Sequence, residues 1–110
     1  MNIERGRIYR VNLEPTIGHE QQGDARPCVV ISRTALNDRT STVLVVPLTT
    51  SARPALPPVL IPVTSMGKPA LALLLQTRSI DKARILSAAG TLSISDLKNI
   101  EDALREVCDL

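Results

Sequence analysis

The part of the chain that first decides the fold is residues 7–13, which read Arg-Ile-Tyr-Arg-Val-Asn-Leu. Polar and apolar side chains alternate along this stretch. That is the period-2 pattern of a β-strand with one buried face and one solvent-facing face. The sequence therefore predicts a half-buried strand at Arg7–Leu13.

Four further apolar stretches predict short strands. They are Pro27–Ser32, Thr42–Leu48, Val59–Val63 and Ala70–Gln76. A proline is tolerated at the first position of a strand, as at Pro27, whereas Pro47 inside the second stretch indicates an edge strand or a bulge. Ala70–Gln76 would also permit a helix by composition, but its apolar run is too short for one. Short strands at near-regular spacing between turn residues indicate a small β-barrel.

The C-terminal segment predicts an amphipathic helix. Ser93 and Asp96, three residues apart, form an approximate capping box in which Asp replaces the usual Glu or Gln. Apolar side chains recur there at helical spacing, at Leu97, Ile100, Leu104 and Val107. We expect this helix to cover the barrel. With 110 residues, the chain is predicted to be one domain over residues 1–110, mostly β with a C-terminal helix.

The composition restricts the core and the ligands. Hydrophobic residues make up 44% of the chain, with no Phe, no Trp and a single Tyr. The core must therefore consist of Leu, Ile, Val and Ala, and aromatic platforms on which bases could stack are nearly absent. A groove for proline-rich peptides, which is lined by aromatic side chains, is disfavoured for the same reason.

The net charge of +2 is unevenly distributed. Residues 1–92 contain eleven Lys and Arg against six Asp and Glu, whereas residues 93–110 contain two against five. A basic body with an acidic C-terminal segment is typical of a polyanion-binding face that is set apart from the helix.

The sequence also predicts a cellular compartment. Met1–Arg10 lacks the continuous apolar stretch of a signal peptide, and the run Ala70–Leu75 is far shorter than the ~20 residues of a membrane helix. We therefore expect a soluble, cytoplasmic protein. Cys28 and Cys108 have no metal-binding spacing, and we expect both to be buried free thiols in a reducing compartment.

Residues 14–26 form a long polar segment with Pro15, Gly18 and Gly23, which predicts a surface loop. Connections of this length in a compact domain are usually functional or mobile. The loop carries His19, the only histidine of the chain.

Five short motifs follow one another in a fixed order along the chain. They are Arg5–Tyr9, Gly18–Gly23, Arg26-Pro27, Val46–Thr50 and Gln76–Lys82. Together with the C-terminal helix, they resemble the MazF/PemK (Kid-like) family of toxin endoribonucleases, over residues from about Glu4 to Leu104. Each motif is weak alone, whereas five in this order and spacing are specific.

The resemblance implies a small SH3-like β-barrel of the CcdB/MazF type that forms a homodimer and serves as the toxin of a type II toxin–antitoxin system. It implies a sequence-selective, metal-independent endoribonuclease, an mRNA interferase, which inhibits translation and growth. In the implied reaction the 2′-hydroxyl of single-stranded RNA attacks the adjacent phosphate, leaving a cyclic phosphate and a 5′-hydroxyl. No cofactor is required.

The resemblance also implies a cognate antitoxin that covers the dimer, with DNA contacted only indirectly, through the antitoxin. Because the body of the chain is basic, we expect the antitoxin to offer an acidic, disordered segment that folds on binding.

Cyclising cleavage of RNA needs a base for the 2′-proton, an acid for the departing 5′-oxygen and positive charge on the phosphate. Arg26 is the first candidate catalytic residue, because a guanidinium binds phosphate oxygens bidentately; an ion pair with Asp24 or Glu20 is the alternative. Thr49 is the second, because its hydroxyl can donate to the phosphate, although it could equally form a turn.

His19 is the third candidate catalytic residue, because its ordinary pKa lies near neutrality; it could equally be a solvated loop histidine. Gln22, Gln76 and Arg78 are candidates for RNA binding, and Arg78 could also serve a structural or interface role. The sequence contains no metal-binding cluster. Two positions depart from the family pattern: Arg10 replaces a common aromatic residue, and Leu75 replaces a common Asp or Glu.

Two other functions remain open at this point. One is a non-catalytic toxin of the same barrel, a CcdB-like gyrase inhibitor, and the other is a non-catalytic binding module. The pair Arg26 and Thr49 favours the nuclease, because a protein that only binds has no need of it.

Overall fold

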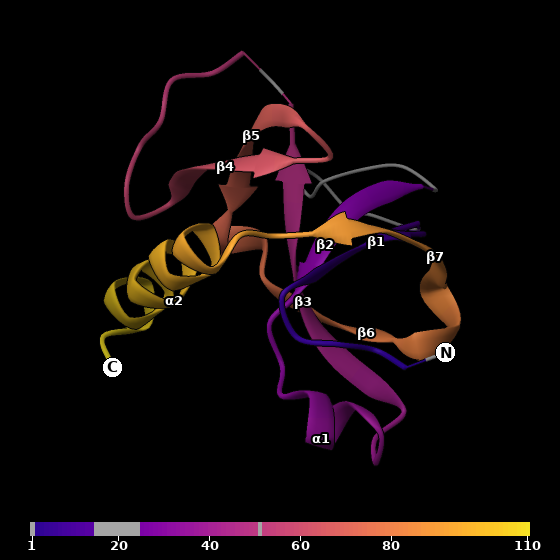
Figure 1. Cartoon of the computed structure of the whole chain (residues 1–110). Coiled ribbons are helices and arrows are strands. Elements are labelled where there is room, and N and C mark those ends of the chain that lie inside the picture. The colour runs from indigo at the N-terminus through magenta and orange to yellow at the C-terminus, as the bar shows by residue number, and fades with distance from the viewer. Residues whose placement is uncertain (1, 15–24, 51) are drawn as a thin grey trace.

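The computed structural model describes residues 2–14, 25–50 and 52–110. It contains seven strands and two α-helices (Figure 1). The strands are β1 (Arg7–Val11), β2 (Arg26–Val30), β3 (Thr42–Thr49), β4 (Leu60–Ser65), β5 (Lys68–Leu73), β6 (Arg78–Asp81) and β7 (Ile85–Thr91). The helices are α1 (Thr34–Asn37) and α2 (Ile94–Cys108), and 3-10 turns lie at Leu74–Gln76 and Lys82–Arg84. The predicted class, mostly β with a C-terminal helix, is confirmed.

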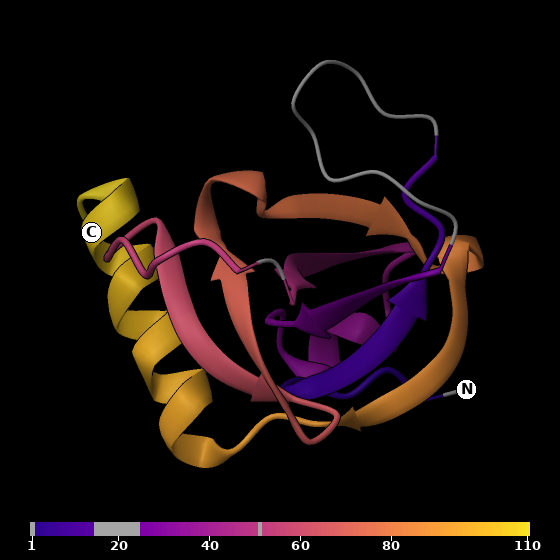
Figure 2. The same ribbon diagram turned by 90° about the horizontal axis from the view of Figure 1, so that it is seen from above.

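All strand pairs are antiparallel, and they follow the order β4-β5-β3-β2-β1-β7, with β6 also paired to β3. Seen from above, the strands curl around a common interior (Figure 2). Within the described residues β4 and β7 do not pair with each other, so the sheet is barrel-like but open.

The central strand is β3, which pairs with β2 on one side. On its other side β3 pairs with β6 through Thr42–Val45 and with β5 through Leu48 and Thr49. Pro47 lies between these two pairings. Of the two predicted alternatives, an edge strand or a bulge, the edge strand was wrong, because β3 is paired on both sides. The missing N–H of Pro47 falls where β3 changes its partner.

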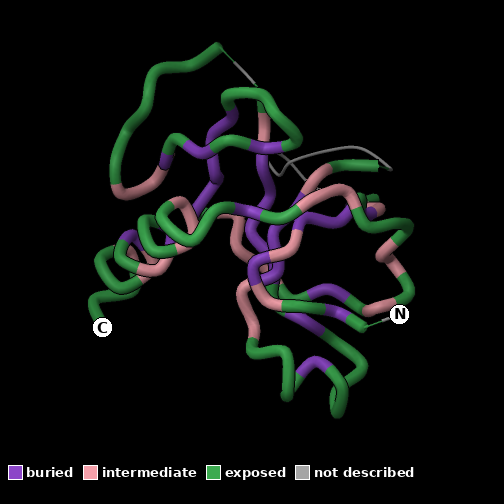
Figure 3. The backbone as a smooth tube through the Cα atoms, viewed as in Figure 1, coloured by how far each residue is buried: buried purple, intermediate pink, exposed green. Residues whose placement is uncertain are grey.

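The sheet has a hydrophobic cluster on each face, because successive side chains of a strand point to opposite sides. Ile8, Val29 and Val46 belong to the first cluster, with α2, β4 and β5. Their neighbours Tyr9, Val30 and Val45 belong to the second, with Ile3 and Ile80. Figure 3 shows the buried residues along the central strands. Both clusters are aliphatic except for Tyr9 and Cys28, which belong to the second.

Tyr9 is fully buried. Its hydroxyl accepts a hydrogen bond from the backbone N–H of Glu4 (2.9 Å) and donates to the carbonyl of Asn2 (3.1 Å). The only aromatic side chain of the protein therefore fixes the N-terminal segment and offers no surface to a ligand.

The helix α2 begins after Ser93, whose hydroxyl accepts from the backbone N–H of Asp96 (3.1 Å). Asp96 does not complete the capping box: its carboxylate accepts from the backbone N–H of Thr64 in β4 (2.9 Å). Farther along, Glu101 forms an ion pair with Arg5. Ile100 and Ala103 are buried, while Leu97, Leu104 and Val107 pack partly buried against the first cluster. The prediction that this helix covers the barrel is confirmed.

The predicted strands agree with β1 to β5 to within a few residues, except that Leu74–Gln76 forms a 3-10 turn instead of extending the fourth stretch. The sequence did not predict β6, β7 or the short helix α1. Most of the long loop, residues 15–24, lies outside the described residues. No helix in the described part of the chain is long and apolar enough to cross a membrane.

Gly6 offers a test of the packing between the N-terminal turn and α2. Its φ of +85° lies in the region that favours glycine, and an added Cβ would come within 3.1 Å of the Leu97 side chain. Gly67 is a matched control, because its φ is +78° but nothing lies within 4 Å of an added Cβ.

We predict that Gly67→Ala lowers the free energy of unfolding by about 1 kcal/mol, from backbone strain alone. Gly6→Ala should lower it by about 2 kcal/mol, because the contact with Leu97 is added to the same strain. Chemical denaturation of both variants measures the difference. Equal losses would show that the approach of the N-terminal turn to α2 is not tight.

Candidate active site

Arg26 and Thr49 lie at one end of the sheet, where β2 begins and β3 ends. The register between these strands pairs Cys28 with Pro47. Arg26 lies two residues before Cys28, and Thr49 lies two residues after Pro47, beyond the last pair of this register. Because alternate residues of a strand point to the same side of the sheet and Cys28 belongs to the second cluster, both side chains lie on the face of that cluster. Arg26 is exposed and Thr49 is half-buried, and both take part in further side-chain interactions.

Arg78 lies on the same face. It opens β6 opposite Val45 of β3, and Val45 alternates with Pro47 and Thr49 along that strand. Arg78 also lies close enough to Cys28 to act on its thiol electrostatically. Since Cys28 is paired with Pro47, the charge of Arg78 acts on the part of the sheet that leads to Arg26 and Thr49.

Cys28 forms the floor between these groups. Burial raises the pKa of its thiol from 9.0 to about 12, and the nearby Arg78 guanidinium lowers it only in part. Burial dominates because a thiolate in an apolar cluster loses its hydration. Cys28 is therefore a neutral, apolar support under a positively charged surface. The expectation of a free, buried thiol is confirmed for Cys28, whereas Cys108 is free but exposed.

The remaining predicted RNA-binding residues are placed less directly. Gln76 ends the 3-10 turn two residues before Arg78 and is half-buried. Its neighbour Leu75 is 70% exposed, so an apolar side chain lies in solvent beside Gln76. His19 and Gln22 lie outside the described residues. The strands β1 and β2, which flank that loop, bring both of its ends toward Arg26.

A hollow of about 350 Å³ lies beside Thr50, next in the chain to Thr49. Its walls come from the segment after β3 and from β4 and β5, with Arg53 at the rim and Leu71 among the apolar residues. Leu71 pairs with Thr49, which connects the hollow to the candidate site. Sequence reasoning missed Arg53, because it lies in a proline-rich segment and belongs to no motif.

The arrangement fits a phosphate group. Arg26 and Arg78 supply positive charge on one face, Thr49 supplies a hydroxyl donor, and the thiol beneath them is neutral. No group of three or more His, Cys, Asp or Glu side chains able to hold a metal ion exists among the residues that the structure describes. The described surface is therefore suited to bind an anion through side-chain donors.

Comparison with known proteins identifies the family. Residues 4–108 match the family described as "PemK-like, MazF-like toxin of type II toxin-antitoxin system". The chain belongs to this family. That membership confirms the resemblance noted in the sequence.

Individual relatives agree with this assignment. The chain is 32% identical over 106 residues to endoribonuclease MazF of Staphylococcus epidermidis, covering 93% of this chain and 88% of that protein. It is 48% identical over 48 residues to endoribonuclease PemK of Escherichia coli, a match that covers 44% of this chain and 35% of that protein.

Solved structures share the fold. MazF from Deinococcus radiodurans superposes with a TM-score of 0.85 at 25% identity, covering 97% of this chain and 96% of that one. A mycobacterial endoribonuclease in complex with its cognate antitoxin superposes with a TM-score of 0.77 at 22% identity, covering 97% and 95%. The second match supports the fold of this family member.

The two thiols provide a test of the floor of the site. At pH 8 we expect iodoacetamide to modify Cys108 in the folded protein and to leave Cys28 unmodified, since the Cys28 thiol is buried and has a pKa of about 12. Mass spectrometry counts the added groups, and Cys108→Ser should leave the folded protein unmodified. Modification of Cys28 at a rate similar to that of Cys108 would show that the Cys28 thiol is accessible from solvent in the folded protein.

Proposed function

We propose that this protein is a toxin of a type II toxin–antitoxin system that cleaves single-stranded RNA as a sequence-selective endoribonuclease. The observation that carries the proposal is that Arg26 and Thr49 lie at the same end of the sheet, on one face, just beyond the paired residues Cys28 and Pro47. Both named relatives are endoribonucleases, which favours cleavage over a gyrase inhibitor or a binding module of the same fold.

In the proposed reaction the 2′-hydroxyl of the RNA attacks the adjacent phosphorus, and the bond to the 5′-oxygen of the next nucleotide breaks. The 2′-proton passes to a base and the 5′-oxygen takes up a proton, leaving a 2′,3′-cyclic phosphate and a 5′-hydroxyl. Arg26 binds the phosphate oxygens, and Thr49 donates a hydrogen bond as negative charge develops on them.

An arginine is a poor base at neutral pH, because its ordinary pKa is ~12 or higher. We therefore assign proton transfer to His19, which precedes Arg26 in the segment of sequence between β1 and β2. Arg78, Gln76 and Gln22 bind the flanking nucleotides in this proposal. Arg53 supplies another positive charge to RNA that passes the hollow beside Thr50.

We further propose that the protein acts in the cytoplasm as a homodimer, without a cofactor, and that a cognate antitoxin inhibits it. The basic surface around Arg26 and Arg78 favours an acidic, disordered antitoxin segment, since opposite charge speeds association and competes with RNA. The structure of a mycobacterial family member with its cognate antitoxin supports the existence of such a partner.

The decisive experiment incubates the protein with mixed-sequence single-stranded RNA in excess EDTA and maps the product ends. We expect cleavage at a preferred sequence, with cyclic phosphate and 5′-hydroxyl ends, at the same rate with and without Mg²⁺. Loss of activity in EDTA that Mg²⁺ restores, or equal cleavage of duplex DNA, would contradict the proposal.

Arg26→Ala and Thr49→Ala should each lower the cleavage rate by ~10² or more, the usual cost of one preorganised donor in a transition state. Leu75→Ala, at an exposed position of the 3-10 turn, is the control, and we expect it to stay within about threefold of the wild type. Circular dichroism verifies that each variant is folded. Folded Arg26 and Thr49 variants with wild-type rates would place the site elsewhere.

The role of His19 is tested by the pH dependence of cleavage. As acid or base it should produce a limb near its ordinary pKa of ~6.5 in the plot of rate against pH. His19→Gln should abolish that limb while leaving RNA binding intact, which fluorescence anisotropy measures. An unchanged pH profile in the variant would show that His19 is a solvated loop residue.

A further inference from the structure

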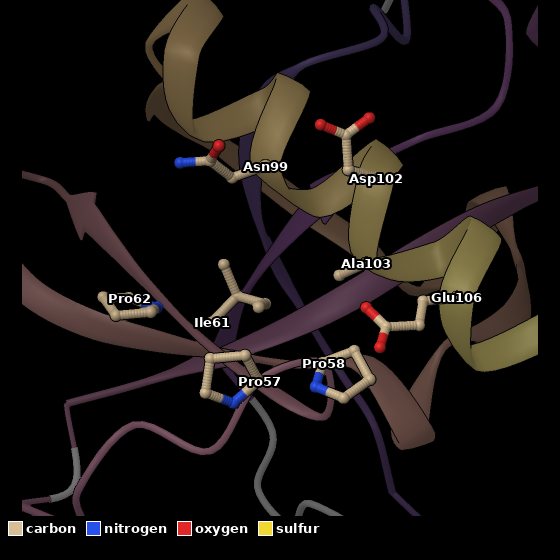
Figure 4. Close-up of a pocket in the computed structure, with 8 residues that line it drawn as sticks. All are labelled: Pro57, Pro58, Ile61, Pro62, Asn99, Asp102, Ala103 and Glu106. Atoms are coloured by element: carbon tan, nitrogen blue, oxygen red, sulfur yellow. The ribbon is translucent and has the colours of Figure 1, made fainter.

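A second hollow, of about 320 Å³, lies between α2 and the turn that leads into β4 (Figure 4). One wall is apolar and comes from Pro57, Pro58, Ile61 and Pro62; the other is Asn99, Asp102, Ala103 and Glu106 of α2. None of these residues belongs to the candidate active site. We call this feature the α2 hollow.

The α2 side of the hollow follows from helix geometry. Residues 99, 102, 103 and 106 are spaced three and four apart, so they share one face of the helix. Ala103 and Ile61 are buried at the base, and the small Ala103 side chain leaves the space open. Polar ends of Asn99, Asp102 and Glu106 therefore surround an apolar floor.

The hydrogen-bonding groups of the α2 hollow are mostly acceptors. Proline has no backbone N–H, and ionised Asp and Glu accept hydrogen bonds without donating any. Only the Asn99 amide offers side-chain donors. This surface therefore favours a cationic ligand over a phosphate group.

The two carboxylates are not equivalent. Asp102 already forms ion pairs with Lys98 (2.9 Å) and Arg105 (3.4 Å). Among the described residues, Glu106 has no ion pair and no side-chain hydrogen bond. Figure 4 shows its carboxylate directed toward Pro58, across the mouth of the hollow. Glu106 is therefore the charge that remains for a ligand.

We propose that the α2 hollow docks a peptide segment of a partner protein that presents an arginine beside an aliphatic side chain. The methylene stem of the arginine packs on Pro58 and Ile61, and its guanidinium reaches the Glu106 carboxylate. Leu56, which precedes Pro57 and is 60% exposed, extends the apolar surface for the neighbouring side chain.

A peptide segment is favoured over a small free cation. A single exposed ion pair contributes little to affinity, so most of the binding must come from apolar contact along the prolines. The charge distribution supports a separate partner: residues 93–110 contain five acidic side chains against two basic ones, in a chain whose remainder is basic. RNA and this segment can therefore bind different surfaces of one molecule. The proposal does not depend on RNA cleavage.

The test uses the full chain labelled with ¹⁵N and a defined probe, the blocked peptide acetyl-Gly-Leu-Arg-Leu-Gly-amide. A second peptide carries citrulline, which is neutral and nearly isosteric, in place of arginine. We expect the arginine peptide to shift the backbone amide signals of Ile61, Asn99, Ala103 and Glu106. The citrulline peptide should bind about fivefold more weakly, as should the arginine peptide to Glu106→Gln.

The control variant is Asp109→Asn, which removes the same charge just beyond α2 and outside the hollow, at a left-handed position (φ 57°) that asparagine tolerates. It should bind the arginine peptide within about twofold of the wild type. Glu106→Gln should also cleave RNA at the wild-type rate, so failure of the docking proposal is distinguishable from failure of the proposed nuclease.

With the two peptides, three results would overturn the proposal. They are equal binding of both peptides, equal binding by Glu106→Gln and the wild type, and peptide-induced shifts confined to other surfaces. Shifts of the same amides on raising the protein concentration alone would overturn it in favour of a second copy as the occupant. Shifts of these amides by a single-stranded RNA oligonucleotide would overturn it in favour of RNA.

Discussion

The structure depends on β3 having two different neighbours along one side. Its first half pairs with β6, its last two residues pair with β5, and β2 lies along the other side. One strand thereby joins the part of the sheet under α2 to the part that holds the N-terminus. A strand with a single neighbour on that side would extend a flat sheet, whereas the change of partner at Pro47 curls the sheet around its interior.

The candidate site is a consequence of that change. At the point where β3 leaves β6 and meets β5, its pairing with β2 ends at Cys28 and Pro47. Thr49, the last residue of β3, and Arg26, the first residue of β2, lie just beyond that pair. Both side chains fall on the face of the second cluster, whose apolar packing stops at this end. Arg26 and Thr49 follow the apolar residues on this face and belong to hydrogen-bonded strands. Their backbone is therefore held more firmly than that of a loop.

The elements that were predicted well are those with many large apolar side chains at strand or helix spacing. Alternation in β1, branched residues in β2 and β3, and the apolar stripe of α2 each bury enough surface to determine local structure. β7 was not predicted because it consists largely of small residues, and only two of its side chains, Ile85 and Leu86, are large and apolar. It forms a strand because β1 supplies a partner, which is a tertiary cause that local pattern does not contain.

Some residues of the candidate site were predicted from the sequence, and others become apparent only in the folded chain. Arg26, Thr49 and Arg78 were found from motifs, and their common face then follows from strand parity and register. Arg53 carries no motif and is brought near Thr49 only by the path of the chain between β3 and β4. The α2 hollow was equally invisible in the sequence, because its two walls lie about forty residues apart and meet only when α2 packs on β4.

The scarcity of aromatic residues connects the two surfaces. Tyr9 is buried in the core, so its ring is not available on either surface for stacking with a ligand. Stacking on aromatic side chains otherwise contributes ~1–3 kcal/mol per base to the binding of single-stranded RNA. Charge must supply a larger share of the attraction on the face of Arg26 and Arg78. Acidic side chains on that face would repel a polyanion and neutralise the arginines, so their concentration on α2 helps that face to stay positive. A chain with so few aromatic residues must therefore rely on charge for binding, and the basic barrel and acidic helix keep the two kinds of charge on separate surfaces.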